Sequence, residues 1–385
     1  MVRKYTSKVV YYASYNSRTH IGTSFTLAKL MPEVLFYVVT AELWPFGDLD
    51  NVIVKQIRRP NCSIRLDSKI YLHTYDYEKD LPSPVSYREH IQDYLEILKD
   101  VDPNLVIVDI TYEVAIWSKL LGYPTCVFYE TIDNSALRIK IAWDSVDSVL
   151  VRYPERFVKK VEGKLHSNMV FLGGTSRFDL GEKVLTIPSV KDSQETVVTF
   201  VSSSNAHDNS MRNEYFQPIV AALARLKNSK VNFFYPKNDD FIIKQQEKYR
   251  HINFIIGDFD QIERFIAKSD IIVSPAGMGI VMETSLYQKP MLLIPALWIY
   301  QEQMNKAKIL HEIGACRYLD PKEMTENTVE DAICEILNDD AVRRKMKAAQ
   351  KELIDGRGYY RLREKITELL ASDKCMNKIS IEEKK

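Results

Sequence analysis

Short apolar runs rich in β-branched and aromatic residues alternate with amphipathic helical stretches along almost all of the 385 residues. Because parallel strands need a crossover helix between them, this alternation predicts an α/β fold built on parallel sheets. The strands expected in the first half are residues 8–14, 34–41, 52–57, 104–109, 125–130, 148–153 and 169–174, and the helices are 24–31, 86–100 and 113–122. The second half repeats the pattern with strands 196–204, 231–236, 252–259, 271–277 and 291–296, and helices 214–227, 261–269, 279–288 and 303–314.

The pattern lapses between residues 175 and 193, where no clear period exists and Pro188 interrupts the chain. We interpret this stretch as a linker between two doubly wound domains, residues 1–174 and 194–356. A helix over residues 357–372 lies beyond the pattern of the second domain and is expected to pack back on the first. The charged tail, residues 373–385, is expected to be disordered.

Composition excludes several classes of protein. Lys plus Arg and Asp plus Glu number 52 each, so no overall charge favours nucleic acid as a partner. The five cysteines show no Cys-x-x-Cys spacing, which argues against a zinc site or a disulfide framework and fits the cytoplasm. No run approaches the roughly 20 apolar residues that cross a bilayer, and no signal-peptide pattern is present. A membrane contact is therefore expected only at the periphery.

The segment with the richest chemistry begins where the strand 271–277 ends. Residues 274–279 read Ser-Pro-Ala-Gly-Met-Gly, and a helix follows at once. Glycines allow the backbone to approach a ligand closely, and a helix N-terminus offers free N–H groups to an anion. The pattern is that of a diphosphate site. The alternative is a tight turn that requires glycine for steric reasons alone.

Acidic and amide side chains follow this turn. Glu283, one turn into the helix, can accept hydrogen bonds from the two hydroxyls of a ribose diol. Glu302 and Gln303 follow the next strand and can form hydrogen bonds with sugar hydroxyls. Taken singly, Glu283 reads as a solvated helix residue and the pair as an ordinary helix start. Their order along one sheet edge indicates a single extended ligand.

This segment resembles the donor-binding region of GT-B glycosyltransferases of the peptidoglycan N-acetylglucosaminyltransferase and UDP-glycosyltransferase group (family 28 and family 1). The resemblance spans about 45 residues in order. It rests on Ser274, Gly277, Glu283, Lys289-Pro290, the strand ending at Pro295, Glu302-Gln303, Ala307 and Gly314-Ala315. It implies two Rossmann-like domains facing across a cleft, with a nucleotide-sugar donor, most simply a UDP-sugar, held by the second.

The resemblance also implies roles for individual residues. The diphosphate would lie on the backbone of residues 276–279 (Ala276, Gly277, Met278 and Gly279), assisted by Ser202, Ser203 and Ser204. Glu283 would bind the ribose, Phe259 would flank the base, and Glu302 with Gln303 would bind the donor sugar. Two positions depart from the pattern. Ile280 replaces a frequent Thr, and Lys306 replaces an Asn and either contacts the donor or faces solvent.

In the first domain the strand 8–14 leads into a loop that only partly resembles the Gly-rich, His-containing loop of the group. His20 and Gly22 match, whereas Asn16 and Ser17 stand where glycines are usual. A histidine there can deprotonate an acceptor hydroxyl, and Asp109, at the end of its own strand, can orient it. A structural role for His20 is the alternative. Arg18, like Gly22, is a candidate contact for an anionic acceptor or the donor phosphates.

The group's chemistry implies an inverting, metal-independent transfer with no cofactor. The Asp258-Phe-Asp260 sequence resembles a metal motif of the other glycosyltransferase fold, but it reads better as a turn that caps a helix. A nucleotide-sugar hydrolase or epimerase and a non-catalytic sugar-nucleotide-binding subunit are the alternatives. His207 is a second candidate for a phosphate contact, and Trp44 and Phe46 for an acceptor pocket. The acceptor itself stays open among a lipid, a natural product, a peptide and a glycan.

Overall fold

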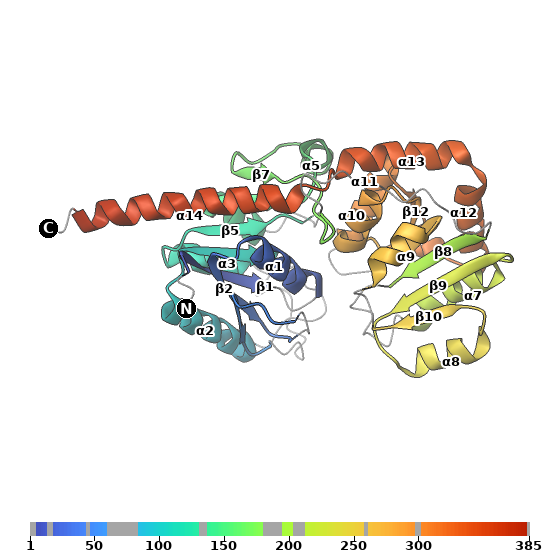
Figure 1. Cartoon of the computed structure of the whole chain (residues 1–385), viewed down its shortest axis with the longest axis horizontal. Coiled ribbons are helices and arrows are strands. Elements are labelled where there is room, and N and C mark those ends of the chain that lie inside the picture. The colour runs from blue at the N-terminus through green and yellow to red at the C-terminus, as the bar shows by residue number, and fades with distance from the viewer. Residues whose placement is uncertain are drawn as a thin grey trace. The chain divides into compact units, whose positions relative to one another are not determined.

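The computed structural model shows an α/β chain in two compact units (Figure 1). It describes residues 5–13, 18–43, 47–59, 84–130, 137–179, 195–202, 212–257, 261–296 and 302–382. Unit 1 comprises residues 1–152, 162–172 and 358–385, and unit 2 comprises residues 153–161 and 173–357.

Unit 1 is built on a parallel sheet with the strand order β3-β2-β1-β4-β5-β6-β7. The order reverses between β1 and β4, and in such sheets ligands bind beyond the carboxyl ends of the two strands at the reversal. The strands are β1 (Ser7–Ala13), β2 (Val34–Thr40), β3 (Val52–Gln56), β4 (Leu105–Asp109), β5 (Thr125–Phe128), β6 (Ser148–Val151) and β7 (Met169–Phe171). The helices are α1 (Arg18–Leu30), α2 (Pro84–Val101), α3 (Tyr112–Leu120), α4 (Leu137–Ser145) and α14 (Gly358–Glu382), while α5 (Glu155–Glu162) begins in unit 2 and ends at the boundary.

Unit 2 repeats this topology with the order β10-β9-β8-β11-β12-β13, so that its reversal falls between β8 and β11. The strands are β8 (Thr196–Val201), β9 (Ser229–Tyr235), β10 (Asn253–Ile256), β11 (Ile271–Ser274), β12 (Met291–Leu293) and β13 (Arg317–Tyr318). The helices are α7 (Gln217–Arg225), α8 (Asp240–Lys248), α9 (Ile262–Lys268), α10 (Met278–Leu286), α11 (Glu302–Glu312), α12 (Glu326–Asn338) and α13 (Asp340–Leu353), with short turns η2 (Arg212–Phe216) and η3 (Pro321–Glu323).

Each unit has its own hydrophobic core. In unit 2 the central strands pack against α7 and α12 through fully buried residues such as Phe200, Leu223 and Ile333. In unit 1 the core includes one face of α14, which contributes Leu362 and Ile366, both fully buried. The last helix of the chain therefore completes the first unit. Its backbone continues to Glu382, so the predicted boundary between helix and tail at residue 372 is wrong.

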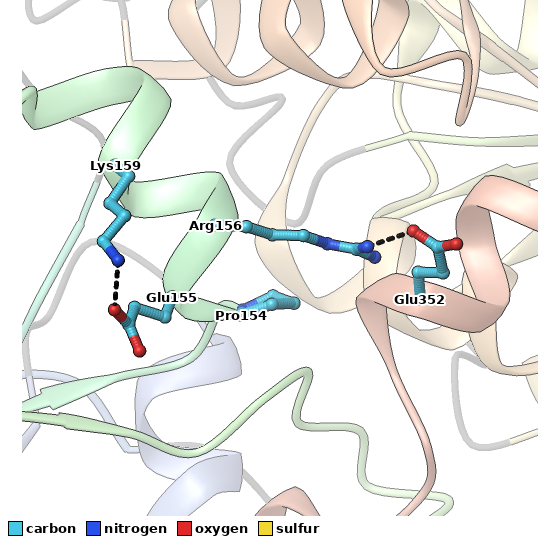
Figure 2. A pocket seen from close by; sticks show the side chains of 5 residues that line it. All are labelled: Pro154, Glu155, Arg156, Lys159 and Glu352. Atoms are coloured by element: carbon cyan, nitrogen blue, oxygen red, sulfur yellow. Dashed lines mark ion pairs between the residues drawn. The ribbon is translucent and has the colours of Figure 1, made fainter.

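The predicted domain boundaries also need correction. Residues 153–161 belong to unit 2, where Arg156 on α5 pairs with Glu352 near the end of α13 (Figure 2). The stretch that follows β7 also belongs to unit 2, because the Gly174 N–H donates to the Leu353 carbonyl at 2.9 Å. Irregular segments without a hydrophobic period give no sequence signal of the unit they join.

Among the helices of the described residues, none is long and apolar enough to span a membrane.

Candidate functional site

The turn between β11 and α10 lies at the strand reversal of unit 2. Gly277 is the N-cap of α10 and contributes no side chain that could cap the helix. Its φ of −65° suits any residue. A Cβ at this position would meet only the Ile280 Cγ2 atom, at 3.9 Å. Steric contacts with the described residues therefore do not require glycine at position 277. The open space lies beside the free N–H groups of a helix N-terminus, which favour an anion.

Ser202 lies across the same reversal, directly after β8. Its backbone N–H donates to the Phe234 carbonyl at 3.1 Å, which fixes the chain at the strand end. Its side-chain oxygen is buried and has no hydrogen-bond partner among the described residues. A buried hydroxyl without a partner is costly, and a ligand oxygen at this edge is one way to satisfy it. Ser203 and Ser204 lie outside the described residues.

Glu283, on α10, is buried rather than solvated and carries an ion pair. Its Oε1 atom accepts from Arg177 Nε at 2.8 Å, and the second oxygen lies 3.5 Å from Arg177 Nη2. Burial raises the pKa of the Glu283 carboxyl, and the Arg177 guanidinium opposes that rise. Arg177 was not singled out from the sequence, because it lies in the stretch interpreted as a linker.

Glu302 and Gln303 begin α11 beyond the end of β12. The Gln303 side-chain oxygen accepts from the Ala296 N–H at 3.1 Å and so ties the helix start to the chain that leaves the strand. Glu302 pairs with Lys306 at 2.5 Å, and the Lys306 side chain is fully buried. The alternative in which Lys306 faces solvent is therefore wrong. The geometry gives the Lys306 ammonium a defined position one turn from the residues expected to bind the sugar.

In unit 1 the two predicted catalytic residues are brought together at the reversal between β1 and β4. His20 Nδ1 lies 3.2 Å from Asp109 Oδ2, at ion-pair distance but without hydrogen-bond direction. Nδ1 is buried, and about a tenth (11%) of the His20 side chain is exposed. The predicted loop is corrected: α1 starts at Arg18, so His20 and Gly22 are helical. The Arg18 side chain lies outside the described part of the chain.

Asp109 is fully buried at the end of β4 and is surrounded by donors. Its Oδ2 atom accepts from the Tyr11 hydroxyl and from Arg152 Nη2, each at 2.8 Å. Burial disfavours the charged carboxylate, but the positive charges of Arg152 and His20 outweigh it and hold the pKa of Asp109 well below its usual range. The next residue, Ile110, has a φ of 60°, which is strained for a β-branched side chain. Such strain often accompanies functional sites.

Phe259, His207, Trp44, Phe46 and the Asp258–Asp260 turn lie outside the described residues. Within the described ranges, no group of three or more His, Cys, Asp or Glu side chains is arranged to hold a metal ion.

A surface hollow in unit 2 is lined by none of these residues. It is lined by Pro154, Glu155, Arg156, Lys159 and Glu352 (Figure 2). Its charged side chains are paired with one another, Arg156 with Glu352 and Lys159 with Glu155, and each is about half or more exposed. We assign no chemistry to this hollow.

Comparisons with known proteins support the fold and the class of enzyme. Residues 168–357 match the family model described as the glycosyltransferase family 28 C-terminal domain. The chain is 26% identical over 129 residues to the UDP-N-acetylglucosamine transferase subunit ALG13 of Debaryomyces hansenii, which covers 33% of this chain and 61% of that protein. It is 21% identical over 334 residues to the UDP-N-acetylglucosamine--N-acetylmuramyl-(pentapeptide) pyrophosphoryl-undecaprenol N-acetylglucosamine transferase of Clostridium novyi, covering 84% of this chain and 88% of that one.

Solved structures share the fold. MurG of Acinetobacter baumannii superposes with a TM-score of 0.62 at 14% identity, covering 94% of this chain and 99% of that one. The spinosyn rhamnosyltransferase SpnG complexed with thymidine diphosphate superposes with a TM-score of 0.66 at 13% identity, covering 93% of this chain and 100% of that one. The fold and the matched domain together identify the chain as a glycosyltransferase with the GT-B fold. Within that class it is similar to the family 28 and UDP-glycosyltransferase group.

Proposed function

We propose that this glycosyltransferase transfers a sugar, N-acetylglucosamine in the first instance, from a UDP-sugar to an acceptor hydroxyl. The observation that carries the proposal is the open N-terminus of α10 at Gly277, flanked by the unpartnered hydroxyl of Ser202 and the buried carboxylate of Glu283. The nucleotide and the sugar follow the relatives, whose names specify UDP-N-acetylglucosamine.

The donor would lie along the strand-reversal edge of unit 2. The N–H groups at the start of α10, around residues 276–279, would hold the diphosphate, and the helix dipole would stabilise its charge as it leaves. Glu283 would accept hydrogen bonds from the ribose. Glu302 and Gln303 would bind the sugar, and the Lys306 ammonium would keep Glu302 oriented.

The chemical step would take place by direct displacement. The acceptor hydroxyl would attack the anomeric carbon, His20 would take its proton, and the bond to the diphosphate would break with inversion. Asp109, 3.2 Å from His20 Nδ1, would orient the ring and stabilise the imidazolium that forms. This route needs no metal, so activity in excess EDTA should match activity in buffer. A strict requirement for Mg²⁺ or Mn²⁺ would contradict it.

We also propose contact with a membrane at its periphery, on the cytoplasmic side, where a lipid acceptor would be presented. The Clostridium novyi relative is named for an undecaprenol-linked acceptor. Trp117 and Leu120 at the end of α3 and Leu121, its C-cap, are 43%, 73% and 52% exposed. Ile141 is exposed on α4, which packs beside α3. Co-sedimentation with anionic vesicles should fall when Leu120 and Leu121 are replaced by Ser. No co-sedimentation of the wild-type protein would contradict the membrane contact, and unchanged co-sedimentation of the variant would show that these side chains do not make it.

The test of function is a donor panel read by release of nucleoside diphosphate, with and without candidate acceptors, followed by mass spectrometry of the products. Release from UDP-N-acetylglucosamine that depends on acceptor is the expected result. Rapid release without acceptor would instead indicate a hydrolase, and binding without turnover of any donor would indicate a non-catalytic subunit.

A further inference from the structure

We infer that Arg152 is a positioning residue that sets the charge of the His20–Asp109 pair, and with it the pH at which His20 can take up a proton. The inference rests on the proposed role of His20 as the base. Arg152 follows β6, two strands away from β4, and belongs to none of the motifs that the sequence shows.

The geometry makes Arg152 a fixed part of the pair. Its side chain is 4% exposed, and its Nη2 atom donates to Asp109 Oδ2, the same oxygen that faces His20. The guanidinium carbon lies 3.8 Å from the centre of the Phe128 ring, which holds the plane of the group from one side. A buried charge at this distance is little screened by water or salt.

Two tyrosines are the other described groups known to interact with Asp109 or Arg152. Tyr11 from β1 donates its hydroxyl to Asp109, and burial raises the pKa of Tyr11 well above its usual value. Tyr359 from α14 interacts electrostatically with both Tyr11 and Arg152. Among these described neighbours, Arg152 is the one permanent positive charge that meets the carboxylate.

The sign of the effect follows from these charges. A buried carboxylate with no other charged partner favours a proton either on the neighbouring imidazole or on itself. The coupled pair therefore stays protonated to a higher pH than a pair whose carboxylate is neutralised by a cation. The guanidinium of Arg152 satisfies Asp109 and cancels much of its field at His20. The pair then loses its proton at a lower pH than it would beside an unpaired carboxylate, and the ring is free to accept a proton from an acceptor hydroxyl.

A purely structural role would leave this titration unchanged. In that case Arg152 and Asp109 would form a core ion pair whose loss lowers stability and nothing else. The two roles therefore differ in a spectroscopic readout that does not depend on turnover.

The experiment is an NMR titration of the full-length protein labelled with ¹³C,¹⁵N-histidine, with His20→Ala used to assign the His20 signal. The midpoint of the His20 titration should rise by about one pH unit or more in Arg152→Met, because a full charge has been removed from a buried site. In Arg152→Lys, which keeps the charge, the midpoint should stay within about half a unit of wild type. Equal midpoints in all three proteins would overturn the inference.

Arg152→Met leaves a buried carboxylate with one fewer partner and risks misfolding. A second comparison avoids this risk. The His20 midpoint is measured in the single variant Asp109→Asn and in the double variant that carries both Asp109→Asn and Arg152→Met, and neither protein has an unpaired carboxylate at position 109. The midpoint should be higher in the double variant, because the lone guanidinium of the single variant repels the imidazolium. A lower or equal midpoint would contradict the inference.

The NMR titration tests the role of Arg152 independently of the proposed function. If transfer occurs, the acid limb of its kcat/KM profile should move with the NMR midpoint in the same variants. If no donor is turned over, the proposed function fails while the titration still tests the role of Arg152.

Discussion

At the scale of single residues, each unit buries one carboxylate at the reversal of its sheet and pairs it with an arginine. Asp109 meets Arg152 in unit 1, and Glu283 meets Arg177 in unit 2. Burial alone would favour the neutral acid in both places. The arginine therefore decides whether the carboxylate can act as an acceptor of hydrogen bonds at neutral pH.

Replacement of Arg177 tests this in unit 2. Burial raises the pKa of Glu283 and Arg177 lowers it, so in Arg177→Met the carboxyl should protonate at a higher pH than in wild type. As the pH falls from 8 to 5.5, UDP affinity measured by calorimetry should drop about tenfold more in the variant, since one pH unit of difference in protonation is a tenfold effect.

Two variants control this measurement. Arg177→Lys keeps the charge and should follow the wild-type profile. Arg225→Met breaks an exposed ion pair with α12 and should leave UDP binding unchanged at every pH. Parallel pH profiles for Arg177→Met and wild type would show that Arg177 does not control Glu283.

The sequence was sufficient to predict the carboxylates but not their partners. Glu283 and Asp109 stand at fixed offsets from strand ends, which a one-dimensional pattern can reveal. Arg177 and Arg152 reach them from 106 and 43 residues away, and only the fold brings them close. Neither arginine belongs to a sequence motif, and Arg177 lies in the stretch where the hydrophobic period is lost. The buried position of Lys306 was equally invisible, because its neighbours on α11 alternate without a strong period.

At the scale of elements, helix starts divide into capped and open ones. Thr325 caps α12 with a reciprocal bond to Thr328, and the Asp339 side chain accepts from the N–H groups of Ala341 and Val342 at the start of α13. These residues are sequence signals of helix starts, and they identify α12 and α13, which hydrophobic runs alone did not predict. The start of α10 at Gly277 has no such side chain.

The distinction predicts different results at the two kinds of helix start. Asp339→Ala should lower the free energy of unfolding by about 1 kcal/mol, because two N–H groups lose their acceptor. UDP affinity should not change, since α13 takes no part in the proposed donor site. Chemical denaturation and calorimetry check both halves, and a loss of UDP binding at full folding would extend the site to α13.

The start of α1 shows why some boundaries escape prediction. Residues 18–23 include Thr19 and Gly22, which are weak helix formers, so the sequence predicts a helix only from residue 24. In the structure the hydroxyls of Thr23 and Thr26 bond back to the carbonyls of Thr19 and Gly22, and Ile21 and Phe25 are buried. Tertiary packing outweighs local preference, and it places His20 in a helix.

At the scale of the whole molecule, the chain enters unit 2 twice, at residues 153 and 173, and returns at residue 358 to finish the core of unit 1. The hydrophobic pattern predicted both sheets and most of their strands because each strand is a separate apolar run. It did not predict that residues 153–161 join unit 2, since ion pairs such as Arg156–Glu352 have no period.

Helix α14 allows the stability of unit 1 to be tested separately from ligand binding by unit 2. Leu362→Ala removes a fully buried side chain of α14 from the core of unit 1 and should lower stability by about 2–5 kcal/mol. UDP binding below the unfolding transition should persist, because the proposed donor residues all lie in unit 2. Loss of UDP binding by a variant whose circular dichroism is native would contradict the assignment of the donor to unit 2 alone.

The central claim is that the turn between β11 and α10 binds a nucleoside diphosphate, and Gly277→Ala tests it most directly. The backbone at Gly277 accepts alanine without strain, and the new methyl group would meet no atom of the described protein closer than 3.9 Å. The free energy of unfolding should therefore stay within about 0.5 kcal/mol of wild type. Calorimetric titration with UDP should show affinity reduced at least about tenfold, because the methyl group occupies the space proposed for the diphosphate. Wild-type UDP affinity in Gly277→Ala, or no UDP binding by the wild-type protein, would contradict the account.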